Sequence, residues 1–125
     1  MIKIVFVEDH KLTRNNLKLV FANFDDFCVT GDYATGEDFI AALPSLSVDV
    51  VLLDFILKNT PMQGDDVARY LRRERPDIKV VMVSGENNLE TLQKMLEAGI
   101  DGFVSKDEGC ADALADAIRS VMMRA

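Results

Sequence analysis

Residues 2–9 read IKIVFVED, a short apolar run that ends in two adjacent acids. Two later runs have the same character, VDVVLL at residues 48–53 and IKVVMV at residues 78–83. All three are rich in valine and isoleucine, and polar and apolar residues hardly alternate within them. This composition is typical of strands whose two faces are both covered in a parallel sheet.

Segments with helical spacing of apolar residues separate these runs. Leu17 and Phe21, for example, lie one helical turn apart after the first run. Two shorter strands are expected at residues 27–33 and 102–105. Five strands that alternate with five helices predict an α/β fold, a doubly wound sandwich in which residues 1–125 form one domain.

Several residues mark where helices begin and end. We expect Asp65 to cap the third helix, which Pro76 prevents from continuing. Asn88 is expected to cap the fourth helix and Gly99 to end it. The last helix is expected to begin after Gly109.

Composition limits the partners that the domain can have. A net charge of −7 argues against direct nucleic-acid binding, because phosphate backbones require a basic surface. Cys28 and Cys110 are too few for a disulfide framework, so we expect a cytoplasmic location. No apolar run approaches the roughly twenty residues of a membrane span, and the first residues do not fit a signal peptide. We therefore expect no membrane contact.

Polar residues follow the expected strands. The first strand ends at Glu8 and Asp9, the third at Asp54, the fourth at Ser84, and the fifth just before Lys106. Ligands of open parallel sheets bind at the carboxyl ends of the strands. The sequence therefore predicts that three carboxylates, a hydroxyl and an ammonium group converge at one edge of the sheet.

This set of groups indicates phosphoryl transfer to a carboxylate. Three crowded carboxylates repel one another unless a cation intervenes, and Mg²⁺ prefers such oxygen ligands. Lys106 adds a second positive charge that can neutralise phosphoryl oxygens. Asp54 lies between the other groups and is the best candidate for the nucleophile, while Ser84 can donate a hydrogen bond to a bound phosphoryl group.

The pattern resembles the receiver domain of two-component response regulators over essentially the whole chain. The matching residues, each at the end of the appropriate strand or just before it, are Glu8, Asp9, Asp54, Ser84, Phe103 and Lys106. The resemblance implies a flavodoxin-like sandwich, with five parallel strands in the order 2-1-3-4-5 and five helices. It also implies that a sensor histidine kinase or a phosphotransfer protein donates the phosphoryl group to Asp54.

The resemblance further implies how the switch works. Asp9, Asp54 and the backbone carbonyl of Ile56 would bind Mg²⁺ directly, and Glu8 would act through water. Ser84 would move inward on phosphorylation, and the aromatic side chain of Phe103 would turn into the space that Ser84 leaves. The face made by the fourth helix, fifth strand and fifth helix would then change.

The sequence says less about which downstream function the domain controls. EDHKLTRNNL (residues 8–17) resembles the subfamily in which a helix-turn-helix DNA-binding domain follows the receiver. The chain is then either a free-standing switch or the receiver of a longer transcription regulator, and phosphorylation-dependent homodimers are possible.

Two departures from the family pattern stand out. Lys58 replaces a proline usual in the family, and Gly64 arrives two residues late, so the 55–64 loop is expected to be long. Asp107 replaces another common proline.

Three alternative functions share part of this pattern. A nucleotide-binding module would need a glycine- or hydroxyl-rich loop after the first strand, where this chain has acids. An aspartyl-phosphate phosphatase usually carries a second acid two residues after the nucleophile, where this chain has Ile56. The alternative kept open is a degenerate receiver that binds partners without phosphorylation.

Overall fold

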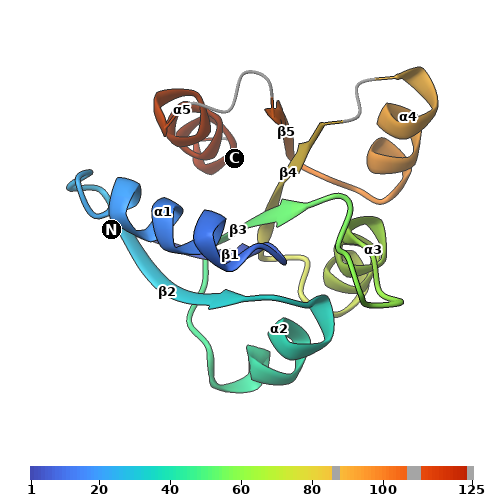
Figure 1. Cartoon of the computed structure of the whole chain (residues 1–125), viewed down its shortest axis with the longest axis horizontal. Helices are drawn as coiled ribbons and strands as arrows, with labels where there is room; N and C mark the ends of the chain where they lie inside the picture. Colours follow the sequence, from blue (N-terminus) through green and yellow to red (C-terminus); the bar gives the residue numbers. More distant parts are fainter. Residues whose placement is uncertain (86–87, 107–110, 124–125) are drawn as a thin grey trace.

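The computed structural model describes residues 1–85, 88–106 and 111–123, in which strands and helices alternate (Figure 1). The strands are β1 (Ile2–Val7), β2 (Phe27–Tyr33), β3 (Val50–Asp54), β4 (Lys79–Ser84) and β5 (Gly102–Ser105). The helices are α1 (Lys11–Phe21), α2 (Gly36–Ala42), α3 (Gly64–Glu74), α4 (Leu89–Glu97) and α5 (Ala111–Met122), with a 3-10 turn at Leu43–Ser45. Glu86, Asp107, Gly109 and Cys110 lie outside the described residues.

The five strands form one parallel sheet in the order β2-β1-β3-β4-β5. The fold class and the strand order expected from the sequence are therefore confirmed. Val7 pairs with Leu53 and Asp54 with Val83, so β1, β3 and β4 end side by side. Ser84 pairs with Ser105, which brings the end of β5 to the same edge.

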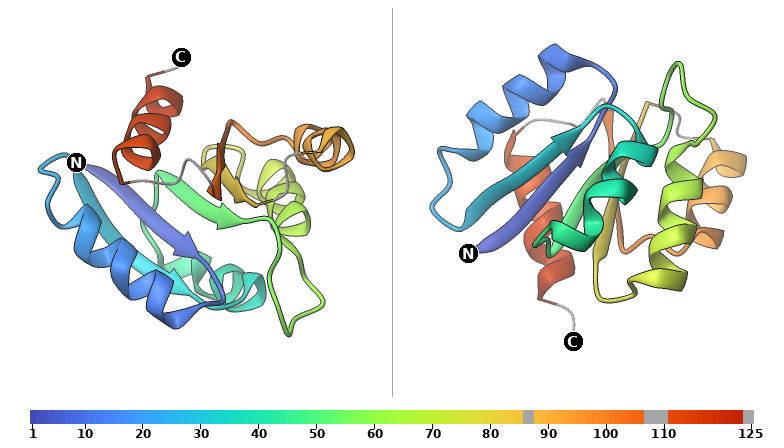
Figure 2. Two further views of the ribbon diagram at one scale, coloured as in Figure 1. Left: turned by 45° about the horizontal axis from the view of Figure 1, so that its top comes forward. Right: turned by 90° about the horizontal axis from the view of Figure 1, so that it is seen from below.

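Both faces of the sheet are covered, as the valine-rich runs predicted. Ile4 and Phe6 pack toward α1 and α5, whereas Val5 and Val7 pack toward α2, α3 and α4 (Figure 2). All four side chains are fully buried. Because consecutive side chains of a strand point to opposite faces, a strand buried on both sides is apolar at nearly every position.

Most of the expected helix ends are confirmed. The Asn88 side chain accepts a hydrogen bond from the Thr91 N–H at 2.8 Å and caps α4. Gly99 follows this helix with φ +82°, a conformation that glycine adopts without strain. No described helix is long and apolar enough to cross a bilayer.

The predicted cap of α3 is wrong. The helix begins at Gly64, and Gln63 rather than Asp65 is its N-cap residue. The Gln63 N–H donates to the Asp66 carboxylate at 2.9 Å, while Asp65 pairs with Arg69 at 3.1 Å. The helix can begin two residues earlier than predicted because its first residue has no side chain and packs directly against the end of β3.

That contact is close. A Cβ atom at Gly64 would lie 2.3 Å from the Asp54 carbonyl oxygen and 2.7 Å from the Phe55 Cα. The Gly64 N–H also donates to the Phe55 carbonyl at 2.9 Å. The start of α3 thus packs against the backbone of Asp54, the last residue of the central strand, and is hydrogen-bonded to Phe55.

Gly64→Ala is therefore expected to lower the free energy of unfolding by about 1–3 kcal/mol, since backbone atoms must shift to admit the methyl group. Urea denaturation measures the change. Gly85→Ala is the control, because its added Cβ would meet only the Lys106 Cδ, at 3.8 Å. Equal stability of both variants and the native protein would contradict the close contact.

Candidate functional site

The predicted polar residues meet at one edge of the sheet. A pocket of about 290 Å³ is lined by Glu8, Asp9, His10, Asp54, Ile56, Lys58, Ser84, Gly85 and Lys106. These residues end or follow β1, β3, β4 and β5, whose carboxyl ends the register places together. Five residues expected at the site from their strand-end positions thus share one cavity.

Three carboxylates form the centre of this pocket. Glu8, Asp9 and Asp54 each offer an oxygen, and these oxygens lie within 4.8 Å of one another. Asp54 is only 4% exposed because every residue of β3 is buried. Acids this close can coexist only by sharing a proton or by binding a cation. Their hard oxygen donors fit Mg²⁺, which is commonly held by one or two carboxylates and water.

In the absence of a cation, protonation of Glu8 relieves the repulsion between the carboxylates. Burial, a hydrogen bond with Asp54 and the charge of Asp54 raise the pKa of Glu8 to about 8. The His10 N–H, which donates to Glu8 Oε1 at 3.2 Å, and the charge of Lys106 oppose this rise. A pKa near 8 favours the protonated form of Glu8 at neutral pH, so a cation that binds the cluster competes with this proton.

Mg²⁺ affinity is therefore expected to rise with pH. The native pKa of Glu8 is raised from 4.5 to about 8, so in this window the cation-free protein carries an extra proton that the cation must release. Affinity should increase by up to about tenfold per pH unit in this window and level off above it. Calorimetric titration at about pH 6.5 and about pH 8.5 measures this, and Glu8→Gln should remove most of the dependence. Equal affinities at the two pH values would contradict a shared proton.

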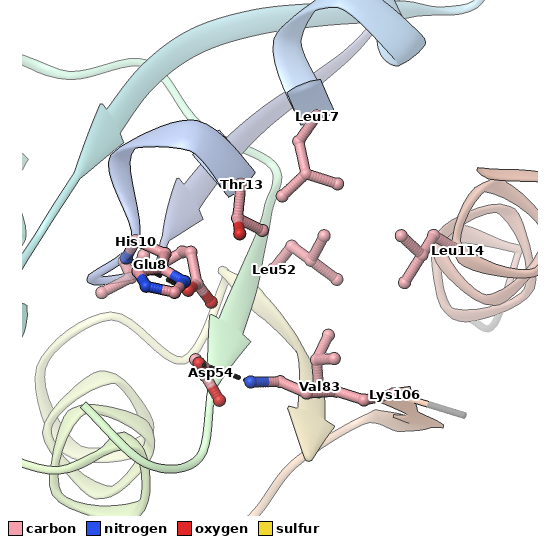
Figure 3. A pocket seen from close by; sticks show the side chains of 10 residues that line it. Glu8, His10, Thr13, Leu17, Leu52, Asp54, Val83, Lys106 and Leu114 are labelled. Atoms are coloured by element: carbon pink, nitrogen blue, oxygen red, sulfur yellow. Dashed lines mark hydrogen bonds and ion pairs between the residues drawn. The ribbon is translucent and has the colours of Figure 1, made fainter. Parts of the chain in front are cut away.

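Lys106 reaches the central acid from β5. Its Nζ lies 3.1 Å from Asp54 Oδ2, and the lysine side chain is 47% exposed (Figure 3). Partial burial acts to lower the pKa of Lys106, but the hydrogen bond and charge of Asp54, with the charges of Glu8 and Asp9, raise it overall. The ammonium group of Lys106 thus stays charged beside Asp54.

An arginine missed at the sequence level supports the acidic loop. Arg14 Nη1 donates to the Glu8 carbonyl at 2.7 Å, and its Nε pairs with Asp32 Oδ2 at 3.1 Å. The Glu8 N–H donates to the Tyr33 carbonyl at 3.0 Å, so the end of β2 also holds the loop. The sequence offered one hint of this role, because Arg14 is a basic residue one turn into the helix that follows Glu8 and Asp9.

The remaining predicted residues occupy distinct places. Ser84 is 1% exposed and lines the pocket at the end of β4. Ile56 is 45% exposed at the rim, and its N–H donates to Asp54 Oδ1 at 3.4 Å. Phe103 does not line the pocket: it is partly buried against the core on the side of α2, α3 and α4.

A second cavity of about 280 Å³ adjoins the acids on the side of α1 and α5 (Figure 3). Its walls are mainly apolar, with Leu17 from α1 and Leu114 from α5 among them. Glu8, Asp54 and Lys106 line both cavities. The three charged residues thus lie between a polar pocket and a more apolar one.

The sequence and the fold are similar to those of known proteins. Residues 4–119 match the family model described as the response regulator receiver domain. The response regulator protein VraR of Staphylococcus epidermidis is 30% identical over 118 residues, which are 94% of this chain and 55% of VraR. VraR of Staphylococcus aureus matches with the same identity and coverage. The chain thus spans about half the length of the curated relatives it matches.

Solved structures share the fold. A LuxR-family DNA-binding response regulator from Staphylococcus aureus aligns with a TM-score of 0.88 and 22% identity, over 97% of this chain and 98% of the other. The isolated receiver domain of RcsB from Salmonella enterica serovar Typhimurium, solved with phosphomimetic BeF3⁻, aligns with a TM-score of 0.86 and 20% identity. That alignment covers 97% of this chain and 88% of the RcsB domain.

Proposed function

The chain belongs to the response regulator receiver domain family, and we propose that it is a phosphorylation-controlled switch whose phosphoryl acceptor is Asp54. One observation carries this proposal. Three carboxylate oxygens lie within 4.8 Å of one another, and the Lys106 ammonium group lies 3.1 Å from the most buried of the three acids. We further propose that residues 1–125 form a single receiver domain.

The acceptor reaction follows from these groups. An Asp54 carboxylate oxygen attacks the phosphorus of a phosphohistidine, the new O–P bond forms, and the P–N bond breaks with its electron pair returning to the imidazole. Lys106 neutralises negative charge on the phosphoryl oxygens. Ser84, which lines the same pocket, would donate a hydrogen bond to one of them.

The metal side of the pocket has its own residues. Asp9, Asp54 and the backbone carbonyl of Ile56 would hold Mg²⁺, with Glu8 acting through water. When bound, the ion supplies charge neutralisation for the transferring phosphoryl group. The chain would act on no further substrate: the catalysis it supports is its own phosphoryl transfer and dephosphorylation.

The response would pass to the surface through β4 and β5. A phosphoryl group adds a charge of about −2 and acceptor oxygens at Asp54, which draws Ser84 inward. Phe103 would then turn into the vacated space and change the face made by α4, β5 and α5. Leu89 and Leu96 of α4 are 82% and 62% exposed, so this helix carries apolar side chains that a partner could contact.

The partners follow from family membership. A sensor histidine kinase or a phosphotransfer protein would donate the phosphoryl group in the cytoplasm, and phosphorylation would favour a homodimer. The output would be transcription, through a DNA-binding domain outside this chain, while this domain itself would contact neither nucleic acid nor membrane.

Intact-mass spectrometry tests the function. The protein incubated with MgCl₂ and a small phosphodonor is expected to gain the mass of one phosphoryl group. The alternative is a degenerate receiver that acts without phosphorylation, and one contact favours it: the Lys58 N–H occupies Asp9 Oδ2 at 3.2 Å. A protein that gains no mass at any Mg²⁺ concentration would overturn the proposed switch and leave this alternative.

A further inference from the structure

The 55–64 loop touches two of the three acids through its backbone. The Ile56 N–H donates to Asp54 Oδ1 at 3.4 Å, and the Lys58 N–H donates to Asp9 Oδ2 at 3.2 Å. These residues flank Leu57, whose side chain is 1% exposed and packs in the core. The path of the backbone on either side of Leu57 therefore sets where two carboxylates lie.

The Gln63 side-chain amide forms hydrogen bonds with the backbone of this part of the loop. Its Oε1 accepts from the Leu57 N–H at 2.8 Å, and its Nε2 donates to the Leu57 carbonyl at 2.7 Å. Nε2 also donates to the Thr60 carbonyl at 2.9 Å. One side chain thus satisfies three backbone groups of the loop, and two of them belong to the residue between Ile56 and Lys58.

The other anchors hold different parts of the loop. The Thr60 hydroxyl donates to the Glu37 carboxylate at 2.7 Å and ties the tip to α2. The Gly64 N–H closes the base at the Phe55 carbonyl, at 2.9 Å. Asn59 turns the chain with φ 63°, a left-handed conformation that asparagine tolerates. Among the hydrogen bonds between the residues that the structure describes, only those of Gln63 hold the Leu57 backbone.

We propose that Gln63 is a positioning residue for the metal site: its amide fixes the Leu57 backbone and so holds the loop against Asp9 and Asp54. This inference rests on the proposed function, because it concerns the same acidic pocket. A connection without the family's usual proline needs another restraint, and the two-sided grip on Leu57 supplies one.

A glutamine suits this position for two physical reasons. An amide offers both an acceptor for the Leu57 N–H and donors for the carbonyls of Leu57 and Thr60. A glutamate of the same length would keep the acceptor but turn an oxygen toward those carbonyls. A leucine would fill similar space and satisfy none of the three groups, which lie in a part-buried part of the loop.

Calorimetric titration with MgCl₂ of Gln63→Leu, Gln63→Glu and the native protein tests the inference without phosphorylation. Both variants are expected to bind Mg²⁺ about tenfold more weakly. The glutamate variant is the sharper test, because its added negative charge alone would tighten binding. Weaker binding there must come from displaced ligands.

Asp66→Ala is the matched control. It removes the carboxylate that accepts from the Gln63 N–H at 2.9 Å, which weakens the start of α3 but leaves the Gln63 amide in place. Its melting temperature should fall, while its Mg²⁺ affinity stays within about twofold of the native value. At saturating MgCl₂, both Gln63 variants should take up a phosphoryl group at close to the native rate.

Two results would overturn the positioning role of Gln63, and a third would refute the proposed function. Native affinity in both Gln63 variants would overturn the positioning role. Equal loss of affinity in Asp66→Ala and the Gln63 variants would show that Gln63 matters only for the stability of α3, and would also overturn it. A native protein that binds no Mg²⁺ would instead refute the proposed function, so the two failures are distinguishable.

Discussion

Asp54→Asn is expected to take up no phosphoryl group under conditions in which the native protein is fully modified. The carboxamide has nearly the shape of the carboxylate but neither its charge nor a nucleophilic oxygen of comparable strength. It also weakens the pairing with Lys106, whose Nζ lies 3.1 Å from Asp54 Oδ2. Intact-mass spectrometry after incubation with MgCl₂ and a small phosphodonor measures the uptake.

Asp25→Asn is the control for this experiment. Asp25 is exposed and precedes β2, at the edge of the sheet opposite to the acidic pocket. The same chemical change there should leave phosphoryl uptake at the native level. Uptake by the Asp54 variant would mean that another residue is the acceptor.

Asp9→Asn is expected to weaken Mg²⁺ binding by at least about tenfold, because it removes one of the three clustered carboxylates while leaving the fold intact. The variant should still accept a phosphoryl group, but only at higher MgCl₂ concentrations. Calorimetric titration gives the affinity, and mass spectrometry over a range of MgCl₂ concentrations gives the dependence of uptake.

The stability of this variant provides an internal check. Removing a charge from a cluster of three acids relieves repulsion, so the cation-free variant should unfold at a temperature no lower than that of the native protein. Asp25→Asn again serves as the control for affinity. A native Mg²⁺ affinity in Asp9→Asn would remove this residue from the metal site.

Much of the architecture could be predicted from local patterns. The valine- and isoleucine-rich runs identified the central strands, since a strand buried on both faces must be apolar nearly throughout. Asn88 and Gly99 identified the ends of α4 by conformational preferences that act over a few residues. The parallel sheet then implied that Glu8, Asp54 and Lys106 meet, because parallel strands end at one edge.

The N-cap of α3 could not be predicted from local sequence preferences, which favour Asp65. Asp65 is a good capping residue by type, yet α3 begins before it, because Gly64 lies against the Asp54 carbonyl. A tertiary contact of this kind outweighs the small energies that favour one cap over another. The sequence contained the glycine, but the need for it appears only once the helix lies against the strand.

The sequence by itself determined the fold and which acids, hydroxyl and ammonium groups share an edge of the sheet. Only the tertiary structure decided how these groups interact: the proton held by Glu8, the support of its loop by Arg14, and the grip of Gln63 on Leu57. The physical reason is distance. Hydrophobic patterning needs only that side chains face the right layer, whereas pKa values and hydrogen bonds depend on separations of a few ångströms between atoms from different segments.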